Sequence, residues 1–143
     1  MKLPRDMQFH EDIRLLVYRP RGLVDRTSVN RIITVVGEFE TASQEPFNRF
    51  SDTVAADAVD LNFEHIIPVS LYRRRFYGNR PPIKSAILAT DATLIHYGKV
   101  HALLTQGSPI KVRVFQDRSE VAQWLKVPIE RLTPNSPTGG KSK

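Results

Sequence analysis

The chain has 143 residues, of which 41% are hydrophobic and 25% charged, and this is typical of a single globular domain with its own core. It contains no cysteine, which excludes disulfide bonds, thiolate catalysis and zinc sites built from cysteine. The formal charge of +6 favours weak contact with anionic partners, and the absence of a secretory signal or a long apolar run predicts a cytoplasmic protein that is not integral to a membrane.

Composition predicts three regions. Residues 1–10 form a flexible leader, residues 11–127 form the folded domain, and residues 128–143 form a flexible tail. The tail is rich in Pro, Ser, Thr, Gly and Lys, and after Leu132 it has no apolar side chain to bury. We therefore expect no fixed structure beyond Leu132 in the free protein.

The domain is predicted to open with a strand and a helix. Residues 12–18 (DIRLLVY) are apolar on both faces, which is typical of a strand covered on both sides, and residues 23–24 extend the sheet briefly. Asp25 or Thr27 caps the helix. Its apolar residues recur at the spacing of one helical face: Val29, Ile32, Ile33 and Val36.

The middle of the chain gives a weaker pattern. Residues 47–52 (FNRFSD) are predicted to form a strand, and residues 53–61 a loop with a fragment of strand. Asn62 then caps a helix, which Pro68 should bend. The side chains of this helix that are expected to face the protein core are Phe63, Ile66, Ile67 and Leu71.

The last part shows the clearest alternation of strand and helix. Residues 83–90 and 110–116 are predicted strands, and Asp91 and Asp117 cap the helices that follow them. The expected buried set of the helix over 92–106 is Leu94, Tyr97, His101 and Leu104. Repeated alternation of this kind predicts an α/β fold with a four- or five-stranded, mainly parallel sheet covered by about four helices.

Four acidic residues lie near the carboxyl ends of predicted strands, where open α/β sheets bind ligands: Asp25, Asp52, Asp91 and Asp117. Together they offer a metal or phosphoryl site. However, three of them immediately precede a helix, where aspartate is a preferred cap. Structural capping is therefore the favoured interpretation.

Other catalytic patterns are missing from the sequence. The four histidines have no metal-ligand spacing, because His96 and His101 lie five apart and face different sides of a helix. No glycine-rich phosphate loop follows a predicted strand, and no serine lies in a nucleophile elbow. The sequence thus predicts no catalytic residues, no cofactor and no metal, and no enzyme.

Four segments, taken in order, resemble a known family. They are RLLVYRPRGLVD, FNRFSD, LYRRRFYGNRPPIKSAILATD and SPIKVRVFQDRSEVAQWL. In this order they resemble the SpoIIAA-like branch of the STAS family (sulfate transporter and anti-sigma factor antagonist domains) over about residues 11–127. The resemblance implies a sheet with helices mostly on one side and a non-enzymatic, regulatory role in protein binding.

The resemblance also implies two further features. Better-known relatives are switched by phosphorylation of a serine in an Asp-Ser motif at a junction of strand and helix. The matching junctions here contain no Asp-Ser pair, and the nearest analogues are Thr53 and Thr93. Some members of this branch are discussed as relatives of lipid carriers, which implies an apolar ligand cavity as an alternative.

Five cations without an intervening acid mark residues 72–84: Arg73, Arg74, Arg75, Arg80 and Lys84. Consecutive arginines fan around a helix, at about 100° per residue, and do not form one stripe. Their stems can cover apolar surface while the guanidinium groups meet the last carbonyls of the helix. Structural capping is favoured over a patch for an anion or acidic partner, and nucleic acid is the least favoured.

These observations leave three hypotheses. The first is a STAS-like module that acts through contacts with an unknown protein partner. The second is a carrier of a small apolar or anionic lipid ligand. The third is an enzyme that uses the acids at the strand ends. The candidate strand-end site comprises Asp52, Thr53, Asp91, Thr93 and Asp117. A homodimer is compatible with each.

Overall fold

The computed structural model describes residues 2–76 and 79–134. Its strands are β1 (Met7–His10), β2 (Leu15–Tyr18), β3 (Gly22–Asp25), β4 (Asn48–Asp52), β5 (Ala56–Asp60), β6 (Ile83–Leu88) and β7 (Ile110–Phe115). Its α-helices are α1 (Arg26–Ala42), α2 (Phe63–Phe76), α3 (Ala92–Leu104) and α4 (Arg118–Leu125). Two short 3-10 helices, η1 (Glu11–Ile13) and η2 (Ile129–Leu132), complete the described elements.

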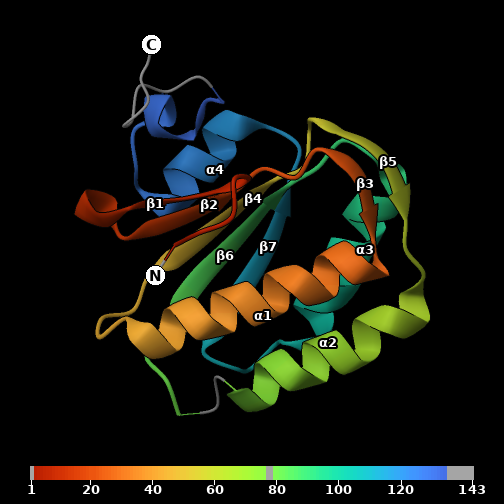
Figure 1. The fold of residues 1–143 in the computed structure, drawn as a ribbon, viewed down its shortest axis with the longest axis horizontal. Helices are drawn as coiled ribbons and strands as arrows, with labels where there is room; N and C mark the ends of the chain where they lie inside the picture. The colour runs from red at the N-terminus through yellow and green to blue at the C-terminus, as the bar shows by residue number, and fades with distance from the viewer. Residues whose placement is uncertain (1, 77–78, 135–143) are drawn as a thin grey trace.

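The main sheet has five strands in the order β1-β2-β4-β6-β7 (Figure 1). The strands β2, β4, β6 and β7 are parallel, and only the pairing of β1 with β2 is antiparallel. The helix α3 connects β6 to β7, as the sequence predicted. The predicted α/β fold with a mainly parallel sheet is therefore confirmed.

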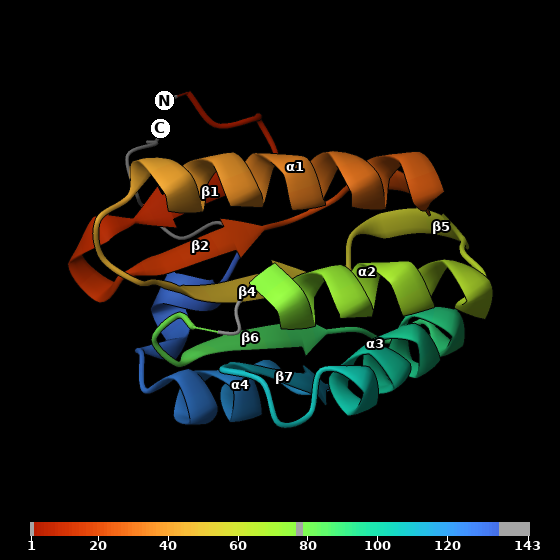
Figure 2. The same cartoon turned by 90° about the horizontal axis from the view of Figure 1, so that it is seen from below.

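Helices cover both faces of this sheet unequally. The helices α1, α2 and α3 lie on one face, while α4 and η2 lie on the other (Figures 1 and 2). Alternate residues along each strand point to opposite faces. The α4 face therefore carries a continuous apolar core formed by Leu15, Val17, Phe50, Ala86, Leu88 and Phe115, which pack against Val121, Ala122, Leu125 and Leu132.

Aspartate side chains cap the N-termini of three helices. Asp25 accepts a hydrogen bond from the amide of Ser28, in a reciprocal capping box. Asp91 accepts from the amides of residues 93 and 94, and Asp117 from the amide of residue 119. These contacts satisfy amide groups that a helix start leaves unpaired. The expected capping role of these three acids is confirmed.

The folded region extends beyond both predicted boundaries. Residues 7–10, expected in the leader, form β1 because they pair along β2 and bury Met7. At the other end, η2 inserts Leu132 into the core, where it is 0% exposed. Residues 12 and 13 of the predicted strand over 12–18 lie in η1 rather than in a strand. Residues 135–143 of the predicted tail lie outside the described residues.

A second, small sheet replaces the predicted extension at residues 23–24. The strands β3 and β5 pair in parallel with each other and not with the main sheet. Thus β5 accounts for residues 53–61, in which the sequence indicated only a strand fragment. One side chain of β3 is buried and none of β5, so periodicity alone provides little signal there.

The helix α2 presents a different face to the core than its apolar pattern predicts. Ile66 is buried as expected, but Ile67 and Leu71 are 49% and 51% exposed. Val69 and Ser70 are buried instead. The inward stripe therefore runs through positions 66, 69, 70 and 73, at the spacing of one helical face. The side chain of Phe63 is not among those described.

Candidate functional site

The structure does not bring the predicted acids together as a ligand site. Asp52 is buried and is the carboxylate partner of both Arg19 and Arg118, the second at 2.7 Å. Asp91 and Asp117 are exposed and occupied as caps. Hydrogen bonds from the side chain and amide of Ser119 lower the pKa of Asp117. In the part of the chain that the structure describes, no group of three or more His, Asp or Glu side chains is placed to hold a metal ion.

The two threonines of the predicted strand-end site lie in different settings. Thr53 follows β4, and its hydroxyl donates to the carbonyl of Leu88 at 2.8 Å. Thr93 lies in the first turn of α3 and is exposed. Thr53 also lines the cavity described below. Of the predicted strand-end residues, Thr53 is thus the one that reaches this cavity.

The five predicted cations also point to different places. Arg74 donates to the carbonyl of Leu104, at the end of α3, at 3.2 Å. Lys84 donates to the carbonyl of Trp124 at 2.8 Å and lies 5.4 Å from the centre of its ring. Arg75 is exposed. The expectation that these arginines meet the last carbonyls of their own helix is corrected for Arg74, which caps a neighbouring helix.

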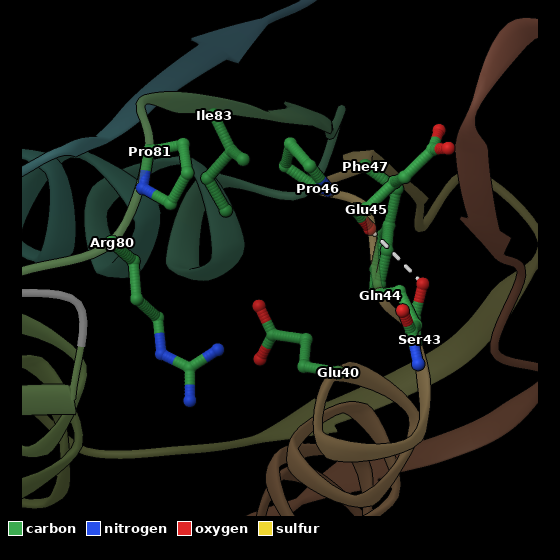
Figure 3. A pocket seen from close by; sticks show the side chains of 9 residues that line it. All are labelled: Glu40, Ser43, Gln44, Glu45, Pro46, Phe47, Arg80, Pro81 and Ile83. Atoms are coloured by element: carbon green, nitrogen blue, oxygen red, sulfur yellow. Dashed lines mark hydrogen bonds between the residues drawn. The ribbon is translucent and has the colours of Figure 1, made fainter.

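Arg80 lies at a small pocket between the end of α1 and the start of β6. Figure 3 shows its guanidinium group pointing toward the carboxylate of Glu40. Glu40 is also the buried ion-pair partner of Arg49, which stacks on Phe47. A carboxylate inside the pocket offsets its positive charge, so this pocket is a poor site for an anion.

A larger apolar cavity lies between the main sheet and the helices α1, α2 and α3. Its volume is about 130 Å³. Half of its lining residues are aliphatic: Val24, Val29, Ile32, Ile33, Leu61, Ile66, Val69, Ile87 and Leu94. The polar lining groups come from the sheet and from two helices: Tyr18, Ser51, Thr53, Ser85, Arg73, Tyr97 and His101. None of the described lining residues is acidic, and Arg73 is the basic residue among them.

A hydrogen bond fixes the polar wall formed by α2 and α3. The hydroxyl of Ser70 lies 2.7 Å from Nδ1 of His101. Burial, and then the nearby charge of Arg73, lower the pKa of His101 to about 3. His101 is therefore neutral at pH 7. Because Ser70 occupies Nδ1, Nε2 is the ring nitrogen that remains for a ligand.

A second polar chain crosses the three helices. Nε2 of His65 lies 3.2 Å from the side-chain oxygen of Asn30, and Nδ1 lies 3.2 Å from the hydroxyl of Tyr97. Burial lowers the pKa of His65 and raises that of Tyr97 to about 12. This network links α1, α2 and α3 through neutral groups. It fixes the position of Tyr97 in the cavity wall.

The arrangement around Ser70 does not fit a catalytic pair. Ser70 is 0% exposed, so a substrate cannot reach its hydroxyl without a rearrangement of the helices. A histidine with a pKa of about 3 is also a weak general base at pH 7. The described groups are better suited to binding than to catalysis.

The sequence carries only partial signals for this cavity. It marks Arg73 and Thr53 as candidate site residues and places His101 on the buried face of α3. Ser70 and the sheet serines were not found, because a serine within an apolar pattern carries no signal of its own. The inward face of α2 does carry a signal in the sequence. Positions 66, 69, 70 and 73 form a helical face that mixes apolar and polar groups.

No family model and no curated protein matches the sequence. A similar solved structure is the crystal structure of an uncharacterized protein from Shewanella loihica PV-4, of the DUF3478 family, described as having a SpoIIAA-like fold. The two chains share 14% sequence identity with a TM-score of 0.51, over 83% of this chain and 89% of the other. At this identity the likeness shows the fold alone. The chain thus has the SpoIIAA-like fold that its motifs indicated. Within the described residues, no helix is long and apolar enough to cross a membrane.

Proposed function

We propose that this protein is a non-enzymatic carrier of a small ligand with an apolar body and an anionic end. The observation that carries the proposal is the cavity between the sheet and the helices α1, α2 and α3, where an aliphatic lining meets Arg73 and the neutral His101. Pockets of this kind bind apolar ligand surface and orient it through a few polar groups.

The volume of the cavity limits the ligand. It measures about 130 Å³, and an apolar cavity of about 150 Å³ in another protein holds benzene. Pockets for drug-sized molecules are larger, at about 300–1,000 Å³. The best match is a small carboxylate such as benzoate or a short fatty acid, whereas a whole lipid requires the helices to move apart.

The chemistry of the polar wall favours a carboxylate over a neutral ligand. A guanidinium group can bind a carboxylate through two parallel hydrogen bonds. A low local dielectric strengthens the attraction between the guanidinium group and the carboxylate, provided that each charge has the other as its partner. Ser51 and Ser85 offer further hydroxyl groups from the sheet.

The test is a titration of the intact protein with sodium benzoate and sodium hexanoate, followed by NMR and by thermal unfolding. Binding should raise the melting temperature and shift the methyl signals of Val29, Ile66 and Ile87, which line the cavity. We expect Arg73→Gln to weaken carboxylate binding at least about tenfold, since a charge-assisted bond is lost. The affinity for the neutral analogue benzyl alcohol should fall much less in this variant.

Two further variants make the test specific. Arg75→Gln removes an exposed arginine two residues along the same helix and should leave binding unchanged. Ser51→Leu fills the cavity from β4 and should block benzoate and benzyl alcohol alike. Equal affinity of the parent and Arg73→Gln proteins, or NMR shifts confined to other surfaces, would contradict the proposal.

A role in protein contacts is a second candidate, and a different surface supports it. The strand β7 lies at the edge of the main sheet, and cationic side chains line the groove beside it. The STAS-like resemblance implies this type of role. The two candidates are separable, because the groove and the cavity have no lining residue in common.

A further inference from the structure

One long edge of the main sheet is open. The strand β7 is the last strand of the sheet order, and Figure 2 shows it between α3 and α4. Within residues 2–76 and 79–134, no strand pairs with its outer side. An exposed edge strand offers free backbone donors and acceptors to another extended segment.

The hydrogen bonds between β6 and β7 identify the groups at this edge. The amide of Ile83 donates to the carbonyl of Pro109 at 3.2 Å, and the amide of Ala89 to that of Phe115 at 3.0 Å. Within a strand, the N–H and C=O groups of successive residues point to alternate sides. The backbone groups of Val112 and Val114 therefore point outward, away from β6.

The side chains of β7 differ between the two faces of the sheet. On the α4 face, Arg113 lies 5.9 Å from the ring centre of Trp124, so Lys111 shares that face with it. Val112 and Val114 point to the α3 face, and Val112 lines the same groove as the apolar Leu103, which is 67% exposed. One face of an added strand would thus meet Lys111 and Arg113, and the other face would meet apolar groups together with Lys99 of α3.

The groove beside β7 is also strongly basic. Lys99, Lys111 and Arg113 line it, and none of its described lining residues is acidic. All three cations are exposed. We propose that β7 and this groove bind an extended acidic segment of a partner protein, which pairs with Val112 and Val114 as an added strand.

The charges favour this occupant over two others. A second copy of the chain paired through β7 would place Lys111 and Arg113 against like charges, which is destabilising between strands. A nucleic acid would match the charge but not the outward N–H and C=O groups of Val112 and Val114. Edge cations can also serve only to prevent aggregation, and the experiment below separates that role from binding.

The probe is the peptide acetyl-EVEVEVE-amide, which places glutamate on one face of a strand and valine on the other. Binding to the intact protein is measured by calorimetry and by the fluorescence of Trp124, the one tryptophan of the chain. We expect binding at low salt that weakens as salt increases. A peptide of the same charge, N-methylated at alternate residues, should bind at least about tenfold more weakly because it loses strand pairing.

The matched variants exchange charge. Lys111→Glu combined with Arg113→Glu should weaken binding of the acidic peptide at least about tenfold and should create binding to acetyl-KVKVKVK-amide. Arg21→Glu combined with Arg26→Glu makes the same change in net charge at exposed positions outside the groove, and should change affinity less than about twofold. Arg73→Gln, which tests the ligand cavity, should have no effect here.

Three results would overturn the inference. Absence of binding at low salt means that the edge cations only prevent aggregation. Equal binding of the N-methylated peptide means that no strand is added. Tighter binding of single-stranded DNA of equal charge, lost in the Lys111→Glu and Arg113→Glu variant, assigns the groove to nucleic acid.

Discussion

His101 shows how burial sets the charge of a single residue. It lies in the wall of the cavity, next to Ser70, and the positive charge of Arg73 acts on it. Both burial and this charge disfavour a second proton, so its pKa falls from 6.5 to about 3. The unfolded chain has no such environment and should titrate near the ordinary value.

We expect this difference to make the folded protein less stable in acid. Between pH 6.5 and about 3 the unfolded state binds a proton at His101 that the folded state does not, so stability is full above pH 6.5 and decreases as the pH falls. One such group contributes a slope of up to about 1.4 kcal/mol per pH unit. Urea unfolding between pH 7 and pH 4 should show a shallower slope for His101→Asn than for the parent.

Other histidines require a control. The pKa values of His10 and His65 are also lowered, mainly by burial, so the parent slope has more than one source. The variants His10→Asn and His65→Asn measure the contributions of these two residues to the slope. Equal slopes for the His101→Asn and parent proteins would show that His101 titrates normally in the fold.

At the scale of elements, a glycine sets the distance between α3 and the sheet. A methyl group added at Gly98 would lie 2.7 Å from Cγ2 of Val114 and 3.4 Å from Cδ1 of Ile87. The first distance is shorter than real side chains allow, and Val114 belongs to a strand rather than to a flexible surface. The close approach of α3 to β6 and β7 therefore depends on glycine at this position.

Gly98→Ala should lower the free energy of unfolding by about 1–3 kcal/mol, because an extra methyl group overpacks the interface. Gly37→Ala is the matched change in α1, where the nearest atom to the new methyl group is the Tyr72 hydroxyl at 3.6 Å. There alanine should stabilise by about 0.5–1 kcal/mol, since it favours helix more than glycine does. Urea denaturation of both variants checks these opposite signs, and equal effects would contradict the packing argument.

At the scale of the whole molecule, Asp52 connects distant parts of the chain. Its carboxylate pairs with Arg19 and Arg118, which lie 33 and 66 residues away in sequence. Arg19 also donates to the carbonyl of Leu132 at 2.7 Å. The cluster thus joins the ends of β2 and β4, the start of α4 and η2.

Asp52→Asn should lower the free energy of unfolding by about 2–4 kcal/mol, because it leaves two partly buried arginines without a counter-charge. Glu45→Gln, in the exposed pair with Arg14 at 3.9 Å, is the matched control and should change stability by less than about 0.5 kcal/mol. Chemical denaturation measures both. A loss as small as that of Glu45→Gln would mean that solvent screens the Asp52 cluster in the folded state.

The sequence by itself determined the alternation of β2, β4, β6 and β7 with helices, the parallel sheet and the aspartate caps. These features depend on local patterns, since a cap at Asp91 or Asp117 contacts amides two or three residues away. Apolar spacing likewise located α1 and α3. The same locality explains why β1, whose pairing with β2 is tertiary, was assigned to the leader.

Only the tertiary structure decided which groups meet. The helix α2 is oriented about its axis so that Ser70 and Arg73 face inward and Ile67 and Leu71 are exposed. Its inward face packs against His101 and the cavity rather than against a closed apolar core. The same is true of the five cations, which the fold sends to different partners although they are close in sequence. A helical pattern fixes which residues share a face, but the packing of other elements fixes which face is buried.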